Sequence, residues 1–160
     1  MFSNKDAYYN NTFRNNGSGV AVMFSKFINM KNNSFKKNWG TASYGLLLKE
    51  IYDAQIEQNI FEENTTGINI EGSTRINYKN NNFIRNGWAL KVAGASYTNI
   101  FSKNNFLHNS FVKIFDPSNC EAILLGPNTL MLFFSKKSTM PSTKGFSGPT
   151  TIISILFFFI

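Results

Sequence analysis

The sequence predicts an all-β protein: a right-handed parallel β-helix of about five coils of roughly 22 residues each, with an irregular C-terminal tail. Three observations carry this prediction. The pattern Asn-x-Phe-x-x-Asn recurs at a nearly constant spacing, a short stretch of alternating apolar residues follows each copy, and Asn and Gly stand where the chain must turn.

The Asn-x-Phe-x-x-Asn motif occurs five times, and its Phe positions are separated by 22, 26, 22 and 23 residues. In stacked coils, equivalent residues lie about 4.8 Å apart, so the motif predicts an interior stack of Phe rings and a ladder of Asn amides. Asn also suits corners because it tolerates the left-handed backbone conformation. The predicted ladder residues are Phe13, Phe35, Phe61, Phe83, Phe106, Asn16, Asn38, Asn64, Asn86 and Asn109.

Two further strands complete each coil. One follows the motif, with alternating apolar residues at 20/22, 46/48, 68/70 and 90/92, and one precedes it, with apolar residues at 28/30, 54/56, 76/78 and 101. The closing Asn of the motif and the following Gly or Ala are three positions apart in three coils, and seven positions apart in the coil that carries "WGTASY". The 26-residue spacing therefore reflects one long loop in an otherwise regular repeat.

The ends of the repeat are also visible. "MFS" occurs at Met1 and again at Met23, so the chain starts inside a coil, and we expect it to be part of a longer β-helix. We place the repeat region at residues 1–111. Residues 112–160 hold two of the 23 Asn and all four Pro, and three interpretations of this tail stay open: a terminal cap, a disordered extension, or an out-of-frame end.

The bulk composition excludes several classes of protein. The formal charge is +7, but Lys and Arg are scattered, so no nucleic-acid partner is predicted. The C-terminal "IISILFFFI" is much shorter than the ~20 apolar residues of a membrane span, so none is predicted. The N-terminus has no recognisable secretory signal.

The residues give little support for catalysis or metal binding. Aligning the coils makes Lys49 and Glu71 neighbours of opposite sign and leaves Glu50 as a lone carboxylate, so no acid–base pair and no enzyme are predicted. Weak candidates for metal ligands are His108 and the thioethers of Met1 and Met23, because paired thioethers suit Cu(I). Packing of Met on the flank explains the same residues.

Aromatic residues give a better indication of a binding surface. Ser18, Tyr44, Thr66 and Trp88 align in one column, and Trp39 lies in the adjacent long loop. Exposed aromatic patches mark partner surfaces. Packing of the long loop on its own coil is the alternative explanation. The predicted partner-binding residues are Trp39, Tyr44, Lys49, Glu50 and Trp88.

Three stretches resemble the NosD-type maturation proteins of nitrous oxide reductase: "GVAVMFSKFINMKNNSF", "NWGTASYGLLLKE" and "GINIEGSTRINYKNNNFIRNGWALKV". The resemblance covers roughly residues 1–111. It implies a periplasmic β-helix that works with an ABC-type transporter in assembling the copper-sulfide centre of nitrous oxide reductase during denitrification. It carries over no catalytic residues and no tightly bound cofactor, although it makes copper a candidate ligand.

These observations favour a scaffold or accessory protein whose flank docks the reductase or the transporter. The alternative is a carbohydrate-binding or polysaccharide-cleaving β-helix. A third interpretation is a fragment without activity of its own, whose ends expose unpaired strand edges.

Overall fold

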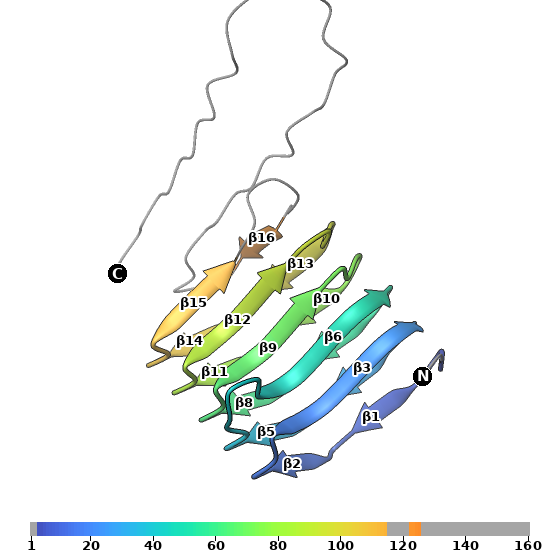
Figure 1. The fold of residues 1–160 in the computed structure, drawn as a ribbon. Helices are drawn as coiled ribbons and strands as arrows, with labels where there is room; N and C mark the ends of the chain where they lie inside the picture. The colour runs from blue at the N-terminus through green and yellow to red at the C-terminus, as the bar shows by residue number, and fades with distance from the viewer. Residues whose placement is uncertain (1–2, 115–121, 126–160) are drawn as a thin grey trace, which may run out of the picture.

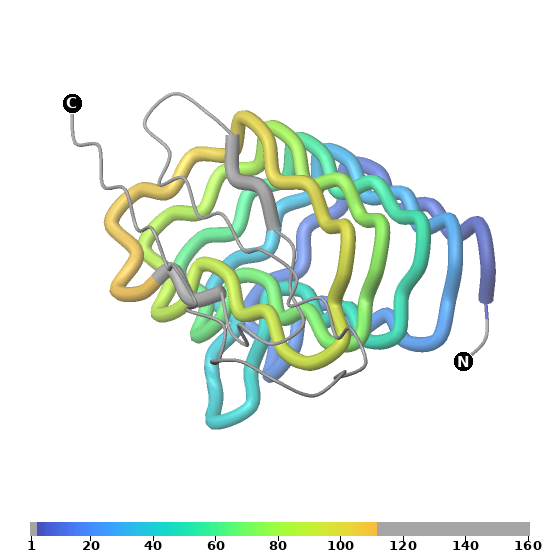
Figure 2. The backbone as a smooth tube through the Cα atoms, turned by 90° about the horizontal axis from the view of Figure 1, so that it is seen from above, coloured from blue at the N-terminus to red at the C-terminus, as the bar shows by residue number. Residues whose placement is uncertain are grey.

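The computed structural model describes residues 3–114 and 122–125, and all of their regular secondary structure is β-strand. The chain winds as a right-handed parallel β-helix, as the sequence predicts (Figure 1). Seen from above, the coils follow one another as similar loops, and the loop that precedes β6 projects beyond them (Figure 2).

Three parallel sheets form the walls of the β-helix, and each coil contributes one strand to each sheet. Sheet A contains β1 (Ala7–Tyr9), β4 (Asn29–Lys31), β7 (Gln55–Glu57), β10 (Asn77–Lys79), β13 (Asn99–Ser102) and β16 (Ala122–Leu125). Sheet B contains β2 (Thr12–Arg14), β5 (Ser34–Lys36), β8 (Ile60–Glu62), β11 (Asn82–Ile84) and β14 (Asn105–Leu107). Sheet C contains β3 (Ser18–Lys26), β6 (Tyr44–Tyr52), β9 (Thr66–Glu71), β12 (Trp88–Ala93) and β15 (Phe111–Ile114).

The five motif Phe rings form a single stack inside sheet B. Neighbouring ring centroids lie 5.2, 4.8, 5.0 and 4.9 Å apart from Phe13 to Phe106, and adjacent rings are inclined by at most 18°. The alternating residues of sheets A and C close the core around this stack, because every second side chain of a strand points inward. Each copy of the sequence motif therefore contributes one ring to the core.

The closing Asn of the motif form a hydrogen-bonded ladder. Asn64 shows the pattern: its Nδ2 donates to Asn86 Oδ1 at 3.0 Å and to the Phe35 carbonyl at 2.9 Å. Its Oδ1 accepts from the backbone N–H and the Nδ2 of Asn38, at 3.1 and 2.8 Å. Both amide protons and both lone-pair positions are thus used, which lets Asn64 be fully buried.

The backbone conformation at this corner corrects one sequence-based explanation. The left-handed residues are Asn15, Lys37, Glu63, Arg85 and His108, each one position before a ladder Asn. The ladder Asn themselves do not adopt positive φ, so tolerance of that conformation is not the reason for their position. The residue before each of them makes the turn, which leaves the Asn side chain inside, where it bonds along the axis.

A second ladder, made by Asn residues outside the predicted set, joins sheets A and B. It is made by the opening Asn of each motif, and its Nδ2–Oδ1 distances are 3.2, 3.1, 3.1 and 3.0 Å. Its members are Asn11, Asn33, Asn59, Asn81 and Asn104. The two ladders flank the Phe stack, so both ends of the motif have the same structural role.

Glycines at the start of the sheet C strands allow the coils to approach closely. A Cβ at Gly45 would lie 2.7 Å from the Gly67 carbonyl oxygen, and a Cβ at Gly67 would lie 2.5 Å from that of Ala89. Real Cβ atoms do not come so near to a backbone oxygen. In the fourth coil Ala89 takes this position, and there the pairing of β12 with β15 shifts register between Trp88 and Lys91.

Strand pairing continues past residue 111, where the sequence motif ends. β15 starts at Phe111 and pairs with β12, and β16 pairs with β13. The three interpretations of the 112–160 tail concern side chains and segments that lie outside the described residues.

Three buried hydroxyls, those of Ser34, Ser43 and Tyr78, have no hydrogen-bond partner among the described residues, and that of Tyr78 in the apolar core leads to a testable prediction. Tyr78 is fully buried and stacks on Phe101 at 4.3 Å, and its hydroxyl has no hydrogen-bond partner within the described part of the chain. Burial raises the pKa of Tyr78 well above its usual value, so the hydroxyl stays neutral. We expect Tyr78→Phe to raise the free energy of unfolding by about 1 kcal/mol, because an unpaired buried polar group is removed.

Urea unfolding followed by circular dichroism measures this gain. Tyr8→Phe is the matched control, because Tyr8 occupies the same column of sheet A and is partly exposed. Equal gains in the two variants would contradict the explanation.

Candidate functional site

The outer face of sheet C carries three of the five predicted partner-binding residues. Tyr44 starts β6, Lys49 lies further along the same strand, and Trp88 starts β12 two coils away. The register places Tyr44 beside Ser18 and Thr66, and Trp88 beside Thr66, as the column in the sequence predicts. Tyr44 and Lys49 are five positions apart along the strand, which is about 17 Å, so the face is broad enough for a macromolecular partner.

The aromatic column on this face is interrupted. Thr66 lies between Tyr44 and Trp88 and is only 4% exposed. Tyr44 and Trp88 are therefore separate, partly buried aromatic residues. Trp88 instead stacks on Phe111 of the next coil, with ring centroids 4.5 Å apart.

The long loop before β6 is tied to the next coil by its backbone. Gly40 N–H donates to Thr65 Oγ1 at 3.2 Å, and this hydroxyl in turn donates to the Gly40 carbonyl at 3.4 Å. Trp39 remains 57% exposed, so its indole is not packed into its own coil. The loop thus holds Trp39 outward, at the edge of the outer face of sheet C.

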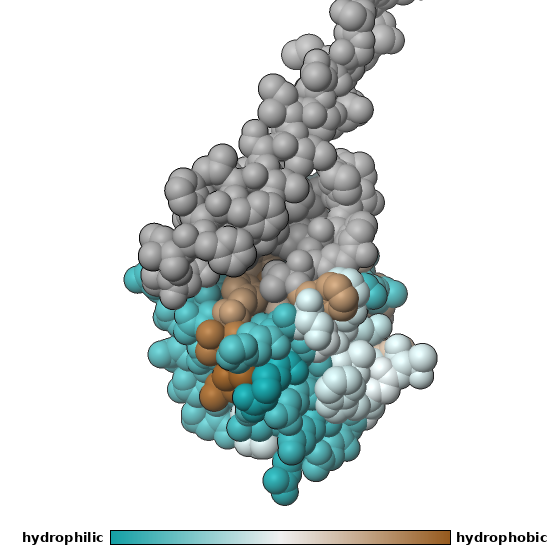
Figure 3. All heavy atoms as spheres, turned by 90° about the vertical axis from the view of Figure 1, so that its left-hand side faces the viewer, coloured by the Kyte–Doolittle hydropathy of each residue, from teal (hydrophilic) through white to brown (hydrophobic). Residues whose placement is uncertain are grey.

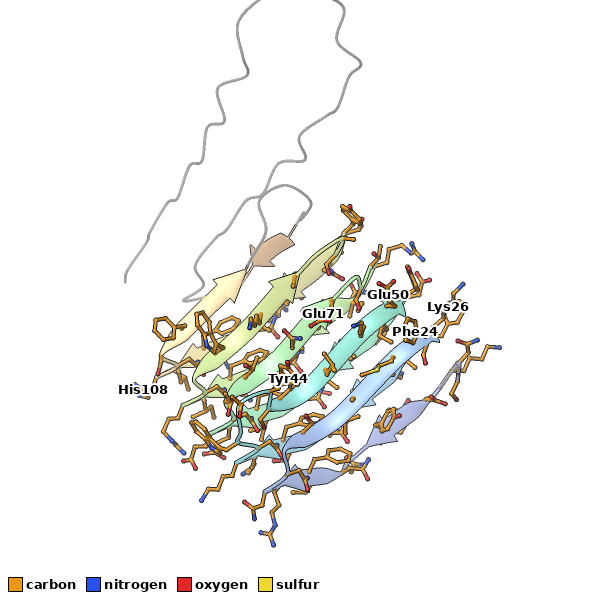
Figure 4. All side chains as sticks on the ribbon, viewed as in Figure 1. Phe24, Lys26, Tyr44, Glu50, Glu71 and His108 are labelled. Carbon is orange, nitrogen blue, oxygen red and sulfur yellow. The ribbon has the colours of Figure 1, made fainter. Side chains whose placement is uncertain are left out.

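Glu50 and Lys49 lie at the other end of the β6 strand, so the five predicted residues form two groups. Lys49 Nζ lies 3.5 Å from Glu71 Oε2, the surface pair that the alignment of coils predicts, and Asn69 Nδ2 donates to Glu71 Oε1 at 2.8 Å. Glu50 accepts a hydrogen bond from the Tyr52 hydroxyl at 3.3 Å. Figure 4 shows Glu50 and Glu71 near the ends of their strands, away from Tyr44.

The opposite corner, between sheets B and C, holds a cluster of charged side chains. Lys36 and Glu62 lie 3.0 Å apart, Lys37 and Glu63 3.7 Å apart, and Arg85 pairs with both carboxylates. These residues line a hollow of about 490 Å³. Figure 3 shows this side of the molecule as mostly hydrophilic. Three cations share the two carboxylates in these ion pairs, which stabilise the corner. Arg14, which also lines the hollow, adds a fourth positive charge.

Ion pairs at two corners predict a loss of stability in acid. The hydrogen bond from Lys36 lowers the pKa of Glu62, and the hydrogen bond from Arg75 lowers that of Asp53, relative to ordinary values of 4.5 and 3.8. A carboxyl whose pKa is lower in the folded state makes its full contribution to stability at pH values above its ordinary pKa. That contribution is lost as the pH falls through the lowered value. We expect the free energy of unfolding to fall as the pH drops below about 4.5.

The matched test compares Arg75→Gln with Arg14→Gln in urea titrations between neutral and acidic pH. Arg14 forms no ion pair among the described residues. Arg75→Gln should reduce the acid-dependent loss, and Arg14→Gln should leave it unchanged. Identical pH profiles for wild type and Arg75→Gln would contradict the role of the Asp53 pair.

The structure does not bring the two described candidate metal ligands, His108 and Met23, together. Within residues 3–111, no group of three His, Cys, Asp or Glu side chains is placed to hold a metal ion. His108 is exposed at the corner between sheets B and C, and Figure 4 shows it on the opposite side from Phe24, the neighbour of Met23. Met1 and Cys120 lie outside the described residues.

The described residues contain no helix long and apolar enough to cross a membrane. None of the curated proteins compared with this chain matches it. A protein-family model does match: the family is described as "Periplasmic copper-binding protein (NosD)", and the match covers residues 1–121.

Proposed function

The chain belongs to the NosD family of periplasmic copper-binding proteins, and from this membership we propose that it serves as a scaffold in the maturation of the copper-sulfide centre of nitrous oxide reductase. In this role it acts with an ABC-type transporter and has a binding rather than a catalytic function. The family supports a copper-related accessory role in the periplasm. That the partners are nitrous oxide reductase and an ABC-type transporter is our proposal.

The observation that carries this proposal is the outer face of sheet C together with Trp39. This face is built on rigid paired strands, and Trp39 projects at its edge with more than half of its surface exposed. Trp and Tyr are enriched among the residues that dominate binding energy at protein interfaces. We therefore propose that Trp39, Tyr44 and Trp88 contact the partner at one end of the face, and Lys49 at the other.

Copper enters this proposal as cargo. Because no three of the described His, Cys, Asp and Glu side chains lie together as ligands, we propose that the partner docked on the outer face of sheet C holds the metal. The contribution of the β-helix is then to position that partner.

Pull-down of purified nitrous oxide reductase, and separately of the transporter, tests the docking face. We expect Trp39→Ala and Trp88→Ala each to weaken capture by about tenfold or more, as is typical for an aromatic residue that becomes buried against a partner. Tyr9→Ala is the matched control, because Tyr9 is 49% exposed and lies on β1 of sheet A. Normal capture by both Trp variants would refute the proposed face, and no capture by the wild-type chain would refute the proposed function.

A further inference from the structure

Two cavities meet at the corner where the chain passes from sheet C to sheet A. The first, of about 320 Å³, is lined by Phe24, Lys26, Tyr52 and Glu50 among others. The second, of about 310 Å³, is lined by Glu50 and Glu71 and by the backbone around Gly72 and Gly94. Glu50 belongs to both, so the two cavities together form a groove that runs from coil to coil along the axis. Each cavity is at the small end of the range for small-molecule sites.

The backbone at the floor of this groove is strained in two coils. Phe24, Glu50, Gly72 and Gly94 occupy equivalent positions and have φ values of 53°, 53°, 56° and 39°. Gly adopts this left-handed conformation without cost, whereas a bulky residue there is an outlier that costs on the order of 1–3 kcal/mol. The fold therefore favours Gly at all four positions. The two coils that depart from it place an aromatic ring and a carboxylate in the same cavity.

The glycines of the other two coils keep the rest of the groove open. A Cβ on Gly72 would lie 2.3 Å from Glu50 Oε1, and a Cβ on Gly94 would meet nothing within 4 Å. The absence of a side chain at Gly72 is thus what allows the Glu50 carboxylate to lie over the next coil. Beyond it, the groove continues over bare backbone.

The charges around the groove are nearly balanced. Lys49 pairs with Glu71, and Arg75 pairs with Asp53 at 2.6 Å, which leaves Lys26 and Glu50 as one cation and one anion in the first cavity. Lys26 and Arg75 also lie 5.8 and 5.9 Å from the Tyr52 ring centroid, so that ring already has cations beside it. This balance favours neither an anionic nor a cationic ligand. It suits a neutral molecule with an apolar face and many hydroxyl groups.

We propose that this groove binds a neutral linear oligosaccharide along the axis of the β-helix. One sugar unit places its C–H face on the Phe24 ring, which is 45% exposed, and hydrogen-bonds through its hydroxyls to Glu50 and Lys26. The next unit lies over Gly72 and Gly94. Glu50 contacts both units, since it lines both cavities.

Isothermal titration with cellohexaose, a neutral linear glucan, tests this site in the full chain. Glu50→Gly and Phe24→Asn remove the two binding groups and leave residues that tolerate the left-handed backbone. We expect each variant to weaken binding by about tenfold or more, the factor that corresponds to the loss of one good contact. Glu50→Gly should also unfold at the same or a higher urea concentration than wild type, because Gly relieves the strained conformation.

Phe27→Asn is the matched control. Phe27 is 53% exposed, has a φ of 59° in the same coil, and lies outside the residues that line the two cavities, so this variant should bind cellohexaose as wild type does. Three results would overturn the proposal: no binding of cellohexaose, unchanged binding by both groove variants, or tighter binding of an acidic glycan or a peptide than of cellohexaose. The Trp39→Ala variant keeps the sugar site intact, so failure of the docking face and failure of the groove are distinguishable.

Discussion

Replacing Asn64 by Asp is expected to lower the free energy of unfolding by about 3–5 kcal/mol, enough to unfold a marginally stable chain. Asn64 Nδ2 donates to Asn86 Oδ1 and to the Phe35 carbonyl, and a carboxylate has no proton for either acceptor. The substitution also buries a negative charge at a fully buried position.

The pH dependence of this variant gives a second readout. Burial next to two acceptor oxygens raises the pKa of the new carboxyl in the folded state. The difference in free energy of unfolding between wild type and Asn64→Asp should therefore be smaller at acidic pH, where the carboxyl is protonated. It should grow as the pH rises through the raised pKa of the folded state.

Asn82→Asp is the matched control for Asn64→Asp. Asn82 lies on the outside of β11, and its Oδ1 accepts a hydrogen bond from Asn105 Nδ2 at 2.8 Å, a bond that Asp preserves. Its effect should stay within about 0.5 kcal/mol. Equal urea midpoints for the two variants would show that the ladder does not contribute to stability in the way its geometry indicates.

Replacing Phe61 by Ala should cost about 3–5 kcal/mol, through lost burial and through the cavity that remains. Phe61 is the middle ring of the stack, 4.8 Å from Phe35 and 5.0 Å from Phe83, and it is fully buried. Both neighbours lose a stacking partner, and rigid strand pairing on both sides limits how far the site can collapse.

The comparison with Phe106→Ala makes this prediction sharper. Phe106 is the last ring of the stack, touches only Phe83 among its described members, and is partly exposed. Its removal should therefore cost about half as much as that of Phe61. Urea unfolding measures both, and a cost for Phe106→Ala equal to or above that for Phe61→Ala would contradict the stack as the centre of the core.

The sequence predicts the architecture well because the same side chains recur at each coil. The Phe positions give the period, and the period gives the parallel register, so Phe35 and Phe61 had to be neighbours once the chain was a β-helix. The second Asn ladder was missed, although its signal was present: Asn33 and Asn59 open the motif at the same spacing as the residues that close it.

The groove was harder to predict than the core. Aligning the coils places Glu50 in a column with Phe24, Gly72 and Gly94. Residue types alone do not reveal that the backbone of all four residues is in the left-handed conformation. Nor do they reveal that Glu50 leans over Gly72, because that direction depends on a backbone turn. The outward direction of Trp39 has the same origin: loop length follows from the spacing, whereas loop direction depends on contacts such as the one between Gly40 and Thr65.

In both ladders, the side-chain amides that bond to the next coil point the same way along the molecule. Asn33 donates to Asn59 and Asn59 to Asn81, and in the other row Asn38 donates to Asn64. Aligned amide dipoles add up, so each row is polar from one end of the rod to the other and polarises its own members. A further coil can prolong the rows only in the same head-to-tail sense, because two rods that met through like ends would set acceptor against acceptor or donor against donor.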